Sequence, residues 1–269
     1  MPKLPTNARA VVTGAGSGFG RAITLELASR GATVIASDVD LASAEETAKL
    51  APGGSVIAAR ADVRSPEEMK ALIDGAADRF GGLDVMVNNA GVAVAGAVGE
   101  VPLDDWHFEI SINLYGVIHG CHFTVPIMKK QKRGFILNVA SAAGLIAAPL
   151  MGPYNVTKAG VIALSETLRT ELEEDGVAIS VLCPTFFRTN IHKSQRSPEK
   201  LRATSAKLVE GAKWSAEQIA RVALRGLERG ELYIIPQTDG KMLWRAKRAL
   251  GGGFYSVAGK VARRRITET

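Results

Sequence analysis

The stretch Ala8–Gly31, ARAVVTGAGSGFGRAITLELASRG, decides the fold class of this 269-residue chain. Its first residues, 8–13, are predicted to form a short buried strand, and a glycine-rich turn follows at 14–20. Apolar residues then recur with helical periodicity until Arg30 and Gly31, a cation and a glycine that are typical of a helix end. A strand, a glycine turn and a helix in this order can cradle phosphate groups.

Glycine suits this turn for two reasons. The turn requires backbone angles that other residues resist, and the missing side chains let backbone N–H groups and the helix N-terminus approach a pyrophosphate. The spacing, Gly14-x-x-x-Gly18-x-Gly20, differs from the G-x-G-x-x-G dinucleotide fingerprint. The turn taken alone is therefore also consistent with a tight connection that binds nothing.

The next predicted strand, Thr33–Ser37, ends at Asp38, eighteen residues beyond Gly20. An acidic side chain near this place binds the adenosine ribose hydroxyls of a dinucleotide, and its charge repels a 2′-phosphate. Val39 follows it, and Ser17 stands in the turn where an arginine or lysine would attract that phosphate. We therefore predict NAD rather than NADP. The alternative interpretation of Asp38 is a solvated turn residue.

Strands and helices continue to alternate after this point. Strands are expected at 55–60 and 83–88, and helices at 41–50 and 65–80. Ser65 and Pro66 supply a cap and a first helical residue, with acids in the following turn. This alternation predicts a single α/β domain, a doubly wound parallel sheet with helices on both faces.

Polar residues interrupt the apolar sequence at two further places. Asn88–Gly91 follows the fourth predicted strand, and ligands of open α/β sheets bind at the carboxyl ends of strands. Asn113 lies in an otherwise apolar, helix-like segment, 106–128. A buried amide needs a hydrogen-bond partner, which water or backbone in a site can supply.

A tyrosine and a lysine, Tyr154 and Lys158, begin an apolar-periodic segment. In a helix, residues four apart share a face, so the phenol and the ammonium would be neighbours. A free phenol ionises near pH ~10, and a nearby cation lowers its pKa towards the range in which tyrosine acts as a base. Ser141 ends a predicted buried strand, 135–140, and its hydroxyl can bind the substrate oxygen. A packed ring beside a solvated amine is the alternative for the pair.

Together these motifs resemble the short-chain dehydrogenase/reductase (SDR) family. The resemblance rests on Thr13-Gly14-x-x-x-Gly18-x-Gly20, Asp62, Asn88-Asn89-Ala90-Gly91, Asn113, Ser141, Tyr154-x-x-x-Lys158 and Pro184–Thr189, and it covers Ala8 to about Tyr233. It implies a single-domain Rossmann fold with a seven-stranded parallel sheet, a nicotinamide cofactor, and a homotetramer or homodimer.

The resemblance also implies roles for individual residues. The catalytic tetrad would be Asn113, Ser141, Tyr154 and Lys158. The cofactor would be bound by Gly14, Ser17, Gly18, Phe19, Gly20, Asp38, Asp62, Val63, Asn89, Ala90, Gly91, Tyr154, Lys158, Pro184 and Thr189. Within this set, Asp62 and Val63 would hold the adenine and Thr189 would meet the carboxamide. One residue departs from the family, which usually has glycine where Thr185 follows Pro184.

Apolar residues flank the predicted site and are expected to contact the substrate. They are Leu145, Met151, Phe186 and Phe187. Such a lining favours a bulky apolar or aromatic secondary alcohol over a sugar or a charged acid, and core packing is an equally open interpretation of these residues. The polar segment 190–214 is expected to form a mobile flap over the substrate.

Positive charge is concentrated near the C-terminus. Of a formal net charge of +6, the segment 241–269 supplies eight cations against one acid, Glu268. We therefore expect a catalytic domain at 1–236 and a basic amphipathic extension at 237–269, with no nucleic acid as a partner because the body is close to neutral. The extension can lie on an anionic membrane, but packing across a neighbouring subunit or capping a pocket is favoured.

The remaining composition argues against other classes of protein. Two cysteines, Cys121 and Cys183, are too few for a disulfide framework or a zinc site. His119 and His122 lie near Cys121, but in a helix the cysteine points away from them, so no metal is predicted. The sequence shows neither a secretory signal nor a run of ~18 apolar residues, so a cytoplasmic location is expected.

The sequence thus predicts an NAD-dependent alcohol dehydrogenase or reductase acting on a bulky apolar or aromatic secondary alcohol or ketone. Two alternatives remain open. An NADPH-dependent ketone or 3-oxoacyl reductase shares the motifs, and Asp38 argues against it. A non-catalytic NADH-binding sensor or scaffold shares the fold, and the four filled tetrad positions argue against it.

Overall fold

The structure, a computed structural model, describes residues 4–256, and of Lys193 it describes the backbone alone. Strand β1 (Arg9–Thr13) is almost wholly buried and leads through the glycine turn into helix α1 (Gly18–Ser29). Ile23 and Leu27, one turn apart on α1, are fully buried against the sheet. The predicted strand, turn and helix are therefore confirmed.

Seven parallel strands form one sheet in the order β3-β2-β1-β4-β5-β6-β7. After β1 these are β2 (Thr33–Asp38), β3 (Val56–Arg60), β4 (Val85–Asn88), β5 (Gly134–Val139), β6 (Val177–Leu182) and β7 (Tyr233–Ile234). The chain builds outward from β1 to β3 and then returns to pair β4 with β1. The strand order therefore reverses between β1 and β4, and ligands of such sheets bind at the reversal, outside the carboxyl ends of the strands. The predicted doubly wound Rossmann fold is confirmed.

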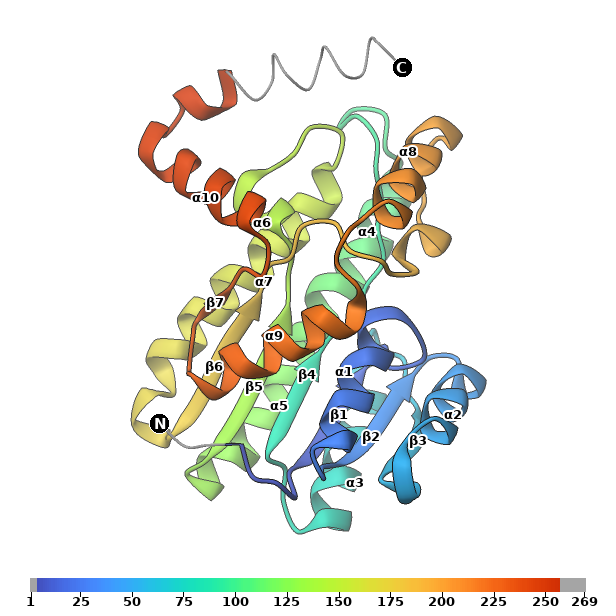
Figure 1. Cartoon of the computed structure of the whole chain (residues 1–269), viewed down its shortest axis with the longest axis vertical. Coiled ribbons are helices and arrows are strands. Elements are labelled where there is room, and N and C mark those ends of the chain that lie inside the picture. The colour runs from blue at the N-terminus through green and yellow to red at the C-terminus, as the bar shows by residue number, and fades with distance from the viewer. Residues whose placement is uncertain (1–3, 257–269) are drawn as a thin grey trace.

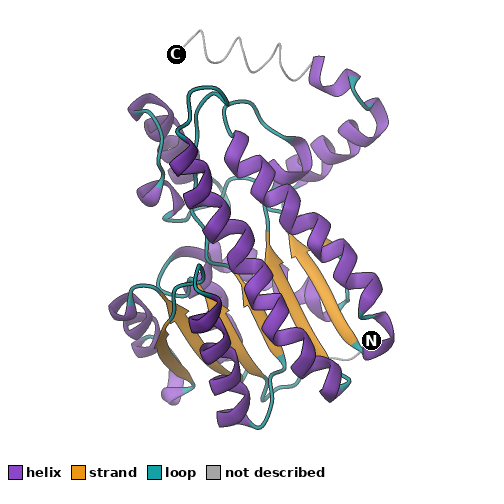
Figure 2. Ribbon diagram, turned by 180° about the vertical axis from the view of Figure 1, so that it is seen from behind, coloured by secondary structure: helices purple, strands orange, loops and turns teal. Residues whose placement is uncertain are grey.

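Helices cover both faces of the sheet (Figures 1 and 2). One face carries α1, α2 (Leu41–Lys49) and α9 (Ala216–Glu228), and the other carries α3 (Pro66–Phe80), α5 (Gly116–Gln131) and α7 (Gly152–Glu171). Successive strand residues serve opposite cores, as the pleat requires. Val12 packs in the α1 and α9 core, and Val11 packs in the α3, α5 and α7 core.

The start of α3 shows why the sequence pattern predicts this helix well. The Ser65 hydroxyl accepts a hydrogen bond from the Glu68 N–H at 3.1 Å, and Pro66 is the first helical residue. Gly81 ends the helix with φ 67°, a left-handed conformation that glycine adopts without strain. Local capping chemistry thus fixes both ends of α3.

The helix-like segment predicted at 106–128 is a helix with an irregularity inside it. Helix α4 (Leu103–Ile110) passes into a π-helical turn, η2 (Ser111–Tyr115), and then into α5. Such turns occur mostly as single insertions and frequently at functional sites. Asn113 is the one fully buried residue of this turn.

The remaining short elements connect these layers. They are η1 (Pro52–Gly54), α6 (Ala142–Ile146), η3 (Glu173–Asp175), η4 (Ile191–Ser194), α8 (Glu199–Glu210) and α10 (Thr238–Leu250). Helices α4, α6, α8 and α10 lie beyond the carboxyl ends of the strands, at the top of Figure 1. No helix in residues 4–256 is long and apolar enough to cross a membrane.

Helix α10 begins the predicted C-terminal extension and is attached to the domain through Thr185. The Thr185 N–H donates to Gln237 Oε1 at 3.1 Å, and its hydroxyl donates to Asp239 Oδ1 at 3.2 Å. Farther along, Lys247 Nζ donates to the Leu145 carbonyl at 2.6 Å, which ties α10 to α6. The residue that departs from the family pattern therefore anchors the start of α10. Residues 257–269, the rest of the extension, lie outside the described residues.

Candidate active site

Tyr154 and Lys158 lie in the first turns of α7, on the face that packs into the protein. Their side chains are 9% and 3% exposed, and Lys158 Nζ lies 5.6 Å from the centroid of the tyrosine ring. Lys158 Nζ also donates a hydrogen bond to the Val139 carbonyl at the end of β5, at 3.0 Å. The predicted juxtaposition of phenol and ammonium on one helix face is therefore present.

Burial dominates the ionisation of this pair. It raises the pKa of Tyr154 to about 12, against a smaller opposing contribution from the Ser141 hydrogen bond. It lowers the pKa of Lys158 to about 8, because the ammonium loses its hydration. The sequence predicts a lowered tyrosine pKa, so the protein surroundings act in the opposite direction to that expectation. In this structure the phenol is protonated at neutral pH.

Ser141 follows β5 and caps helix α6. Its hydroxyl accepts a hydrogen bond from the Ala143 N–H at 3.1 Å and donates to the Pro184 carbonyl at 3.5 Å. The Ala142 N–H also donates to the Pro184 carbonyl, at 2.9 Å. The segments after β5 and β6 are thus joined at Pro184, and the serine hydroxyl is held on the side of the Tyr154 phenol.

Asn113 is fixed to the loop that follows β4. Its Oδ1 accepts from the Val92 N–H at 2.8 Å, and its Nδ2 donates to the Val92 carbonyl at 2.9 Å. Its Nδ2 also donates to Oε1 of Glu109 at 3.0 Å. Glu109 is not among the residues predicted for the site, although an acid four residues before Asn113 in an apolar segment is a visible signal.

The glycine turn has the geometry that a bound pyrophosphate needs. Gly14 and Gly18 have φ of 64° and 51°, and a Cβ on Gly20 would lie 1.9 Å from the Gly14 carbonyl oxygen. Ser17 at the N-cap of α1 makes no side-chain capping hydrogen bond, so its hydroxyl does not occupy the first N–H groups of the helix. The residues present therefore fit a dinucleotide phosphate group.

Asn89 holds this turn against the end of β4. Its Nδ2 donates to the carbonyls of Thr13 and Gly14 at 2.8 and 3.0 Å. The Thr13 hydroxyl in return accepts from the N–H groups of Asn89 and Ala90 at 3.0 and 3.2 Å. Gly91 comes next, and a Cβ there would lie 3.1 Å from Asn113 Oδ1 and 3.5 Å from Lys158 Nζ. The polar turn thus links the glycine turn with the tetrad.

Asp38 ends β2 beside the glycine turn. Its Oδ2 accepts from the Gly16 N–H at 2.9 Å, and its Oδ1 accepts from the Asp40 N–H at 3.1 Å. The carboxylate is partly exposed, as a group that binds ribose hydroxyls must be. Asp38 is therefore hydrogen-bonded to the glycine turn.

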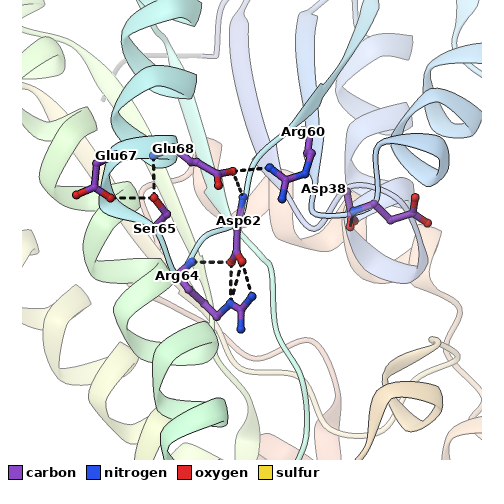
Figure 3. Close-up of polar contacts among 8 residues, drawn as sticks. Asp38, Arg60, Asp62, Arg64, Ser65, Glu67 and Glu68 are labelled. Carbon is purple, nitrogen blue, oxygen red and sulfur yellow. Dashed lines mark hydrogen bonds and ion pairs between the residues drawn. The ribbon is translucent and has the colours of Figure 1, made fainter.

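Arg60 and Arg64, the two arginines drawn with Asp38 in Figure 3, are each paired with an acid. Arg60 stands opposite Asp38 in the β2–β3 register, but its Nη1 bonds Glu68 Oε2 at 2.9 Å. Arg64 bonds both oxygens of Asp62, with Nε at 3.0 and 2.9 Å, and its hydrogen bonds hold the pKa of Asp62 below its usual value. Asp62 is expected to hold the adenine. In this structure both oxygens of its carboxylate accept hydrogen bonds from Arg64.

The four predicted substrate residues lie in different surroundings. Met151 packs with Ala93 and Ile191 beside Tyr154 and so lines the tetrad. Phe187 packs edge-on against Phe19 with ring centroids 6.1 Å apart. Phe186 is 49% exposed, and Leu145 is buried in the α3, α5 and α7 core. Met151 is the member of the set that the structure brings to the phenol.

The predicted flap, 190–214, contains η4 and α8. The neighbouring Thr189 faces the glycine turn, since a Cβ on Gly18 would lie 2.8 Å from its Oγ1. Arg196 holds the flap to α4, with its guanidinium 2.9 Å from Asp105 and its Cζ 3.6 Å from the Phe108 ring centroid. The Arg196 backbone also bonds Ala93 and Ala95, at 3.0 and 3.1 Å. The flap thus reaches the loop beside Tyr154.

The cysteines and histidines noted in the sequence have structural contacts. Cys121 is buried against the polar pair of Asn88 and Asn138, whose side chains share a 2.8 Å hydrogen bond. His119 Nδ1 donates to the Val63 carbonyl at 2.9 Å, and His122 packs edge-on against Phe123. No cluster of three or more potential metal ligands occurs within residues 4–256.

A doubly wound parallel sheet, a glycine turn at α1 and a buried Tyr154–Lys158 pair define the class of Rossmann-fold oxidoreductases. The chain belongs to the short-chain dehydrogenase family, because a family profile described as short chain dehydrogenase matches residues 8–200. Members of this family bind a nicotinamide cofactor.

Individual relatives agree with this assignment. The chain is 33% identical over 233 residues to a 3-oxoacyl-acyl-carrier-protein reductase of Thermotoga maritima, covering 86% of this chain and 94% of the relative. It is 37% identical over 191 residues to a D-beta-hydroxybutyrate dehydrogenase of Rhizobium meliloti, covering 69% and 74%. An SDR crystal structure from Burkholderia phymatum in complex with NAD superposes with a TM-score of 0.88 at 33% identity, covering 93% of this chain and 95% of the other.

Proposed function

We propose that this protein is an NAD-dependent oxidoreductase that transfers a hydride between nicotinamide and a bulky apolar or aromatic secondary alcohol or ketone. The observation that carries the proposal is the buried Tyr154 phenol with Lys158 Nζ 5.6 Å from its ring and Ser141 beside it. This arrangement can move one proton to or from a substrate oxygen. Bound nicotinamide would accept or supply the hydride.

Each tetrad residue has a task that its position permits. Tyr154 exchanges a proton with the substrate oxygen, and the Ser141 hydroxyl holds that oxygen by a hydrogen bond. Lys158 places a positive charge near the phenol and so favours the phenolate form. Asn113, fixed by Val92 and Glu109, orders a water that passes protons from Lys158 towards solvent. Much of the rate depends on holding the reacting carbons in contact.

Charges around the adenosine end support NAD over NADP. Asp38 presents a carboxylate beside the glycine turn, and a 2′-phosphate there would meet like charge. Arg60 and Arg64 could oppose this preference, but they are bonded to Glu68 and Asp62. The NAD complex of the Burkholderia phymatum relative also supports this choice.

The substrate class is inferred from the wall beside Tyr154. Met151, Ile191 and Ala93 form an apolar cluster with the phenol. Apolar surface of this kind favours an apolar substituent on the carbinol carbon. Phe187, which packs edge-on against Phe19 of the glycine turn, supplies an aromatic ring at that turn.

Reduction of a 3-oxoacyl substrate is the second candidate. Two observations favour it: a relative with 33% identity is a 3-oxoacyl-acyl-carrier-protein reductase, and the phenol of Tyr154 is a ready proton donor at neutral pH. A non-catalytic NADH-binding sensor or scaffold is the third, and the four filled tetrad positions oppose it.

One assay separates these candidates. Purified protein is mixed with NAD or NADP and a panel of steroid, aryl-alkyl and aliphatic secondary alcohols, and in the reverse direction with ketones and a 3-oxoacyl thioester. Absorbance at 340 nm reports turnover, and nicotinamide fluorescence reports binding. Turnover with NAD on a bulky alcohol supports the proposal. Preference for NADPH and the thioester supports the second candidate, and binding with no turnover supports the third.

We further propose that the chain forms a homodimer or homotetramer. Tyr115 in η2 and Val156 in α7 are 53% and 51% exposed, and exposed apolar side chains on these helices suit contact with a second copy. Light scattering of the purified protein tests this. Packing of the extension 237–269 against a neighbouring subunit and a cytoplasmic location also remain predictions.

A further inference from the structure

Glu109 is a buried carboxyl group inside the site that the tetrad roles leave unexplained. It has no exposed surface, and it lies one helical turn before Asn113, on the last turn of α4. Its Oε1 accepts the 3.0 Å hydrogen bond from Asn113 Nδ2. The Val94 N–H favours its charged form, yet its Oε2 has no hydrogen bond of normal geometry to any described residue.

A carboxyl group is an expensive choice at this position. A glutamine would accept the same hydrogen bond from Asn113 without the cost of burying a charge. A structural requirement for an acceptor therefore does not account for the acid. Because Oε2 has no hydrogen bond of normal geometry, no fixed donor holds that oxygen in its charged form.

Titratable and charged groups lie on α7, on the flap and on α4, and those of α7 are the ones that interact with Glu109. On α7, Lys158 and Tyr154 both interact with it electrostatically. On the flap, Arg196 is engaged with Asp105 instead. On α4 itself, Asp104 and His107 are exposed, and Asp105 holds Arg196. Cys183, after β6, is buried and faces Lys158 but not Glu109.

The electrostatic coupling runs in a definite direction. Burial raises the pKa of Glu109 to about 8, and the positive charge of Lys158 opposes that rise. In return, a negative Glu109 opposes the lowering of the Lys158 pKa and raises that of Tyr154 further. The carboxyl group therefore changes charge in the same pH range as Lys158.

We propose that Glu109 is a positioning residue that orients the Asn113 amide and whose ionisation controls the charge on the Tyr154–Lys158 pair. The inference rests on the function proposed above, because Tyr154 must exchange the substrate proton for this control to affect catalysis. Glu109 touches neither substrate nor cofactor in this account. It acts through Asn113 and through the electric field at α7.

Two substitutions separate the two parts of the proposal. Glu109→Gln keeps an acceptor for Asn113 but removes the titrating charge. Glu109→Asp keeps the charge but withdraws it from Asn113 by one methylene. Asp104→Asn is the matched control, since it removes one carboxylate from the same helix at an exposed place.

The expected results follow from the effect of the Glu109 charge, which raises the pKa values of Tyr154 and Lys158. In Glu109→Gln, loss of the negative charge lowers the pKa of Tyr154, so the rising limb of the pH profile for alcohol oxidation moves to lower pH by roughly one unit. Glu109→Asp keeps the wild-type pH profile and loses kcat at unchanged KM, because the Asn113 amide is less well held. Asp104→Asn changes neither quantity.

A second measurement does not depend on activity. A carboxyl whose pKa rises from 4.5 to about 8 on folding costs stability progressively as pH increases through that window. The difference between the Tm of Glu109→Gln and the Tm of wild type should therefore increase from pH 4.5 to about pH 8 and level off above that pH. Asp104→Asn should show a constant difference.

The outcomes distinguish the inference from the function on which it rests. Wild-type turnover with an unshifted profile and a pH-independent Tm difference in Glu109→Gln overturns the inference and leaves the function standing. Absence of turnover in wild type overturns the function, and the Tm series then decides whether Glu109 titrates within the fold. A shifted profile together with a rising Tm difference supports both.

Discussion

Lys158 Nζ lies 5.6 Å from the centre of the Tyr154 ring and is bonded to the Val139 carbonyl at 3.0 Å. The cation is thus held beside the phenol by the end of β5, independently of any substrate. Burial nevertheless outweighs the opposing hydrogen bond from Ser141 and raises the pKa of Tyr154 to about 12. The protein alone therefore prepares a proton donor, and oxidation of an alcohol requires the phenol to be deprotonated.

Replacing the phenol should abolish turnover without abolishing cofactor binding. In Tyr154→Phe the ring still fills its buried place, but the proton exchanged with the substrate has no donor or acceptor. We expect kcat to fall by about 10²- to 10⁴-fold, the range of general acid–base contributions. Steady-state kinetics measures the fall, and NADH fluorescence titration should show that the variant still binds the cofactor.

Tyr115→Phe is the control for this substitution, because it removes a hydroxyl from a tyrosine that is 53% exposed. Its kinetics should match the wild type. Normal turnover in Tyr154→Phe would exclude the assigned proton exchange.

The two directions of the reaction should depend differently on pH. Because the pKa of Tyr154 is raised, the phenol form needed for reduction persists through neutral pH, and the phenolate form needed for oxidation increases with pH. We expect kcat/KM for oxidation to rise between about pH 7 and about pH 10, while kcat/KM for reduction is flat or falls. A rate of oxidation that decreases over this range would contradict the assignment.

Much of the fold and the site could be predicted from the sequence because local chemistry specifies them. Gly14 and Gly18 need positive φ, Ser65 and Pro66 start a helix, and Tyr154 and Lys158 are placed together by helical spacing alone. Each of these features depends on a few adjacent residues, so a pattern in the chain is enough to reveal it.

Other features depend on tertiary contacts and could not be predicted. The direction of the Tyr154 pKa shift follows from burial, which no spacing reports. The pairing of Arg64 with Asp62 and the anchoring of α10 by Thr185 join groups whose geometry only the folded chain defines. Glu109 was visible in the sequence, but its burial was needed to separate it from an exposed acid.

Cofactor preference should change when the charge of Asp38 is removed. Asp38→Asn keeps an oxygen that can accept from the Gly16 N–H, so the turn should persist, but it no longer repels a 2′-phosphate. We expect the ratio of kcat/KM for NAD to that for NADP to fall by roughly 10-fold, the equivalent of one screened charge contact. Coenzyme titration of both proteins measures the ratio.

Asp40→Asn controls for a general change in surface charge, because Asp40 caps α2 next to Asp38 and is exposed. It should leave the ratio unaltered. An unchanged ratio in Asp38→Asn would mean that the preference is set elsewhere in the site.

Stability away from the site should depend strongly on Asp84. Burial pushes the pKa of this carboxyl upward, but hydrogen bonds from Arg9 outweigh the effect and leave it below the usual value. Arg9 Nε and Nη2 each lie 2.7 Å from its oxygens, and Arg133 Nε lies 3.4 Å away. Because the folded pKa is lowered, this stabilisation is present at neutral pH and is lost as pH falls through that pKa.

Asp84→Asn should therefore reduce the free energy of unfolding at neutral pH by about 2–4 kcal/mol, since it leaves two guanidinium groups without their carboxylate. Urea denaturation at neutral pH and at a series of acidic pH values measures the loss, which should shrink as pH falls through the lowered pKa of wild-type Asp84. Asp74→Asn, which removes an exposed carboxylate paired with Lys70, should cost less than about 0.5 kcal/mol. A loss in Asp84→Asn no larger than in Asp74→Asn would show that the Arg9–Asp84 pair contributes no more than a surface contact.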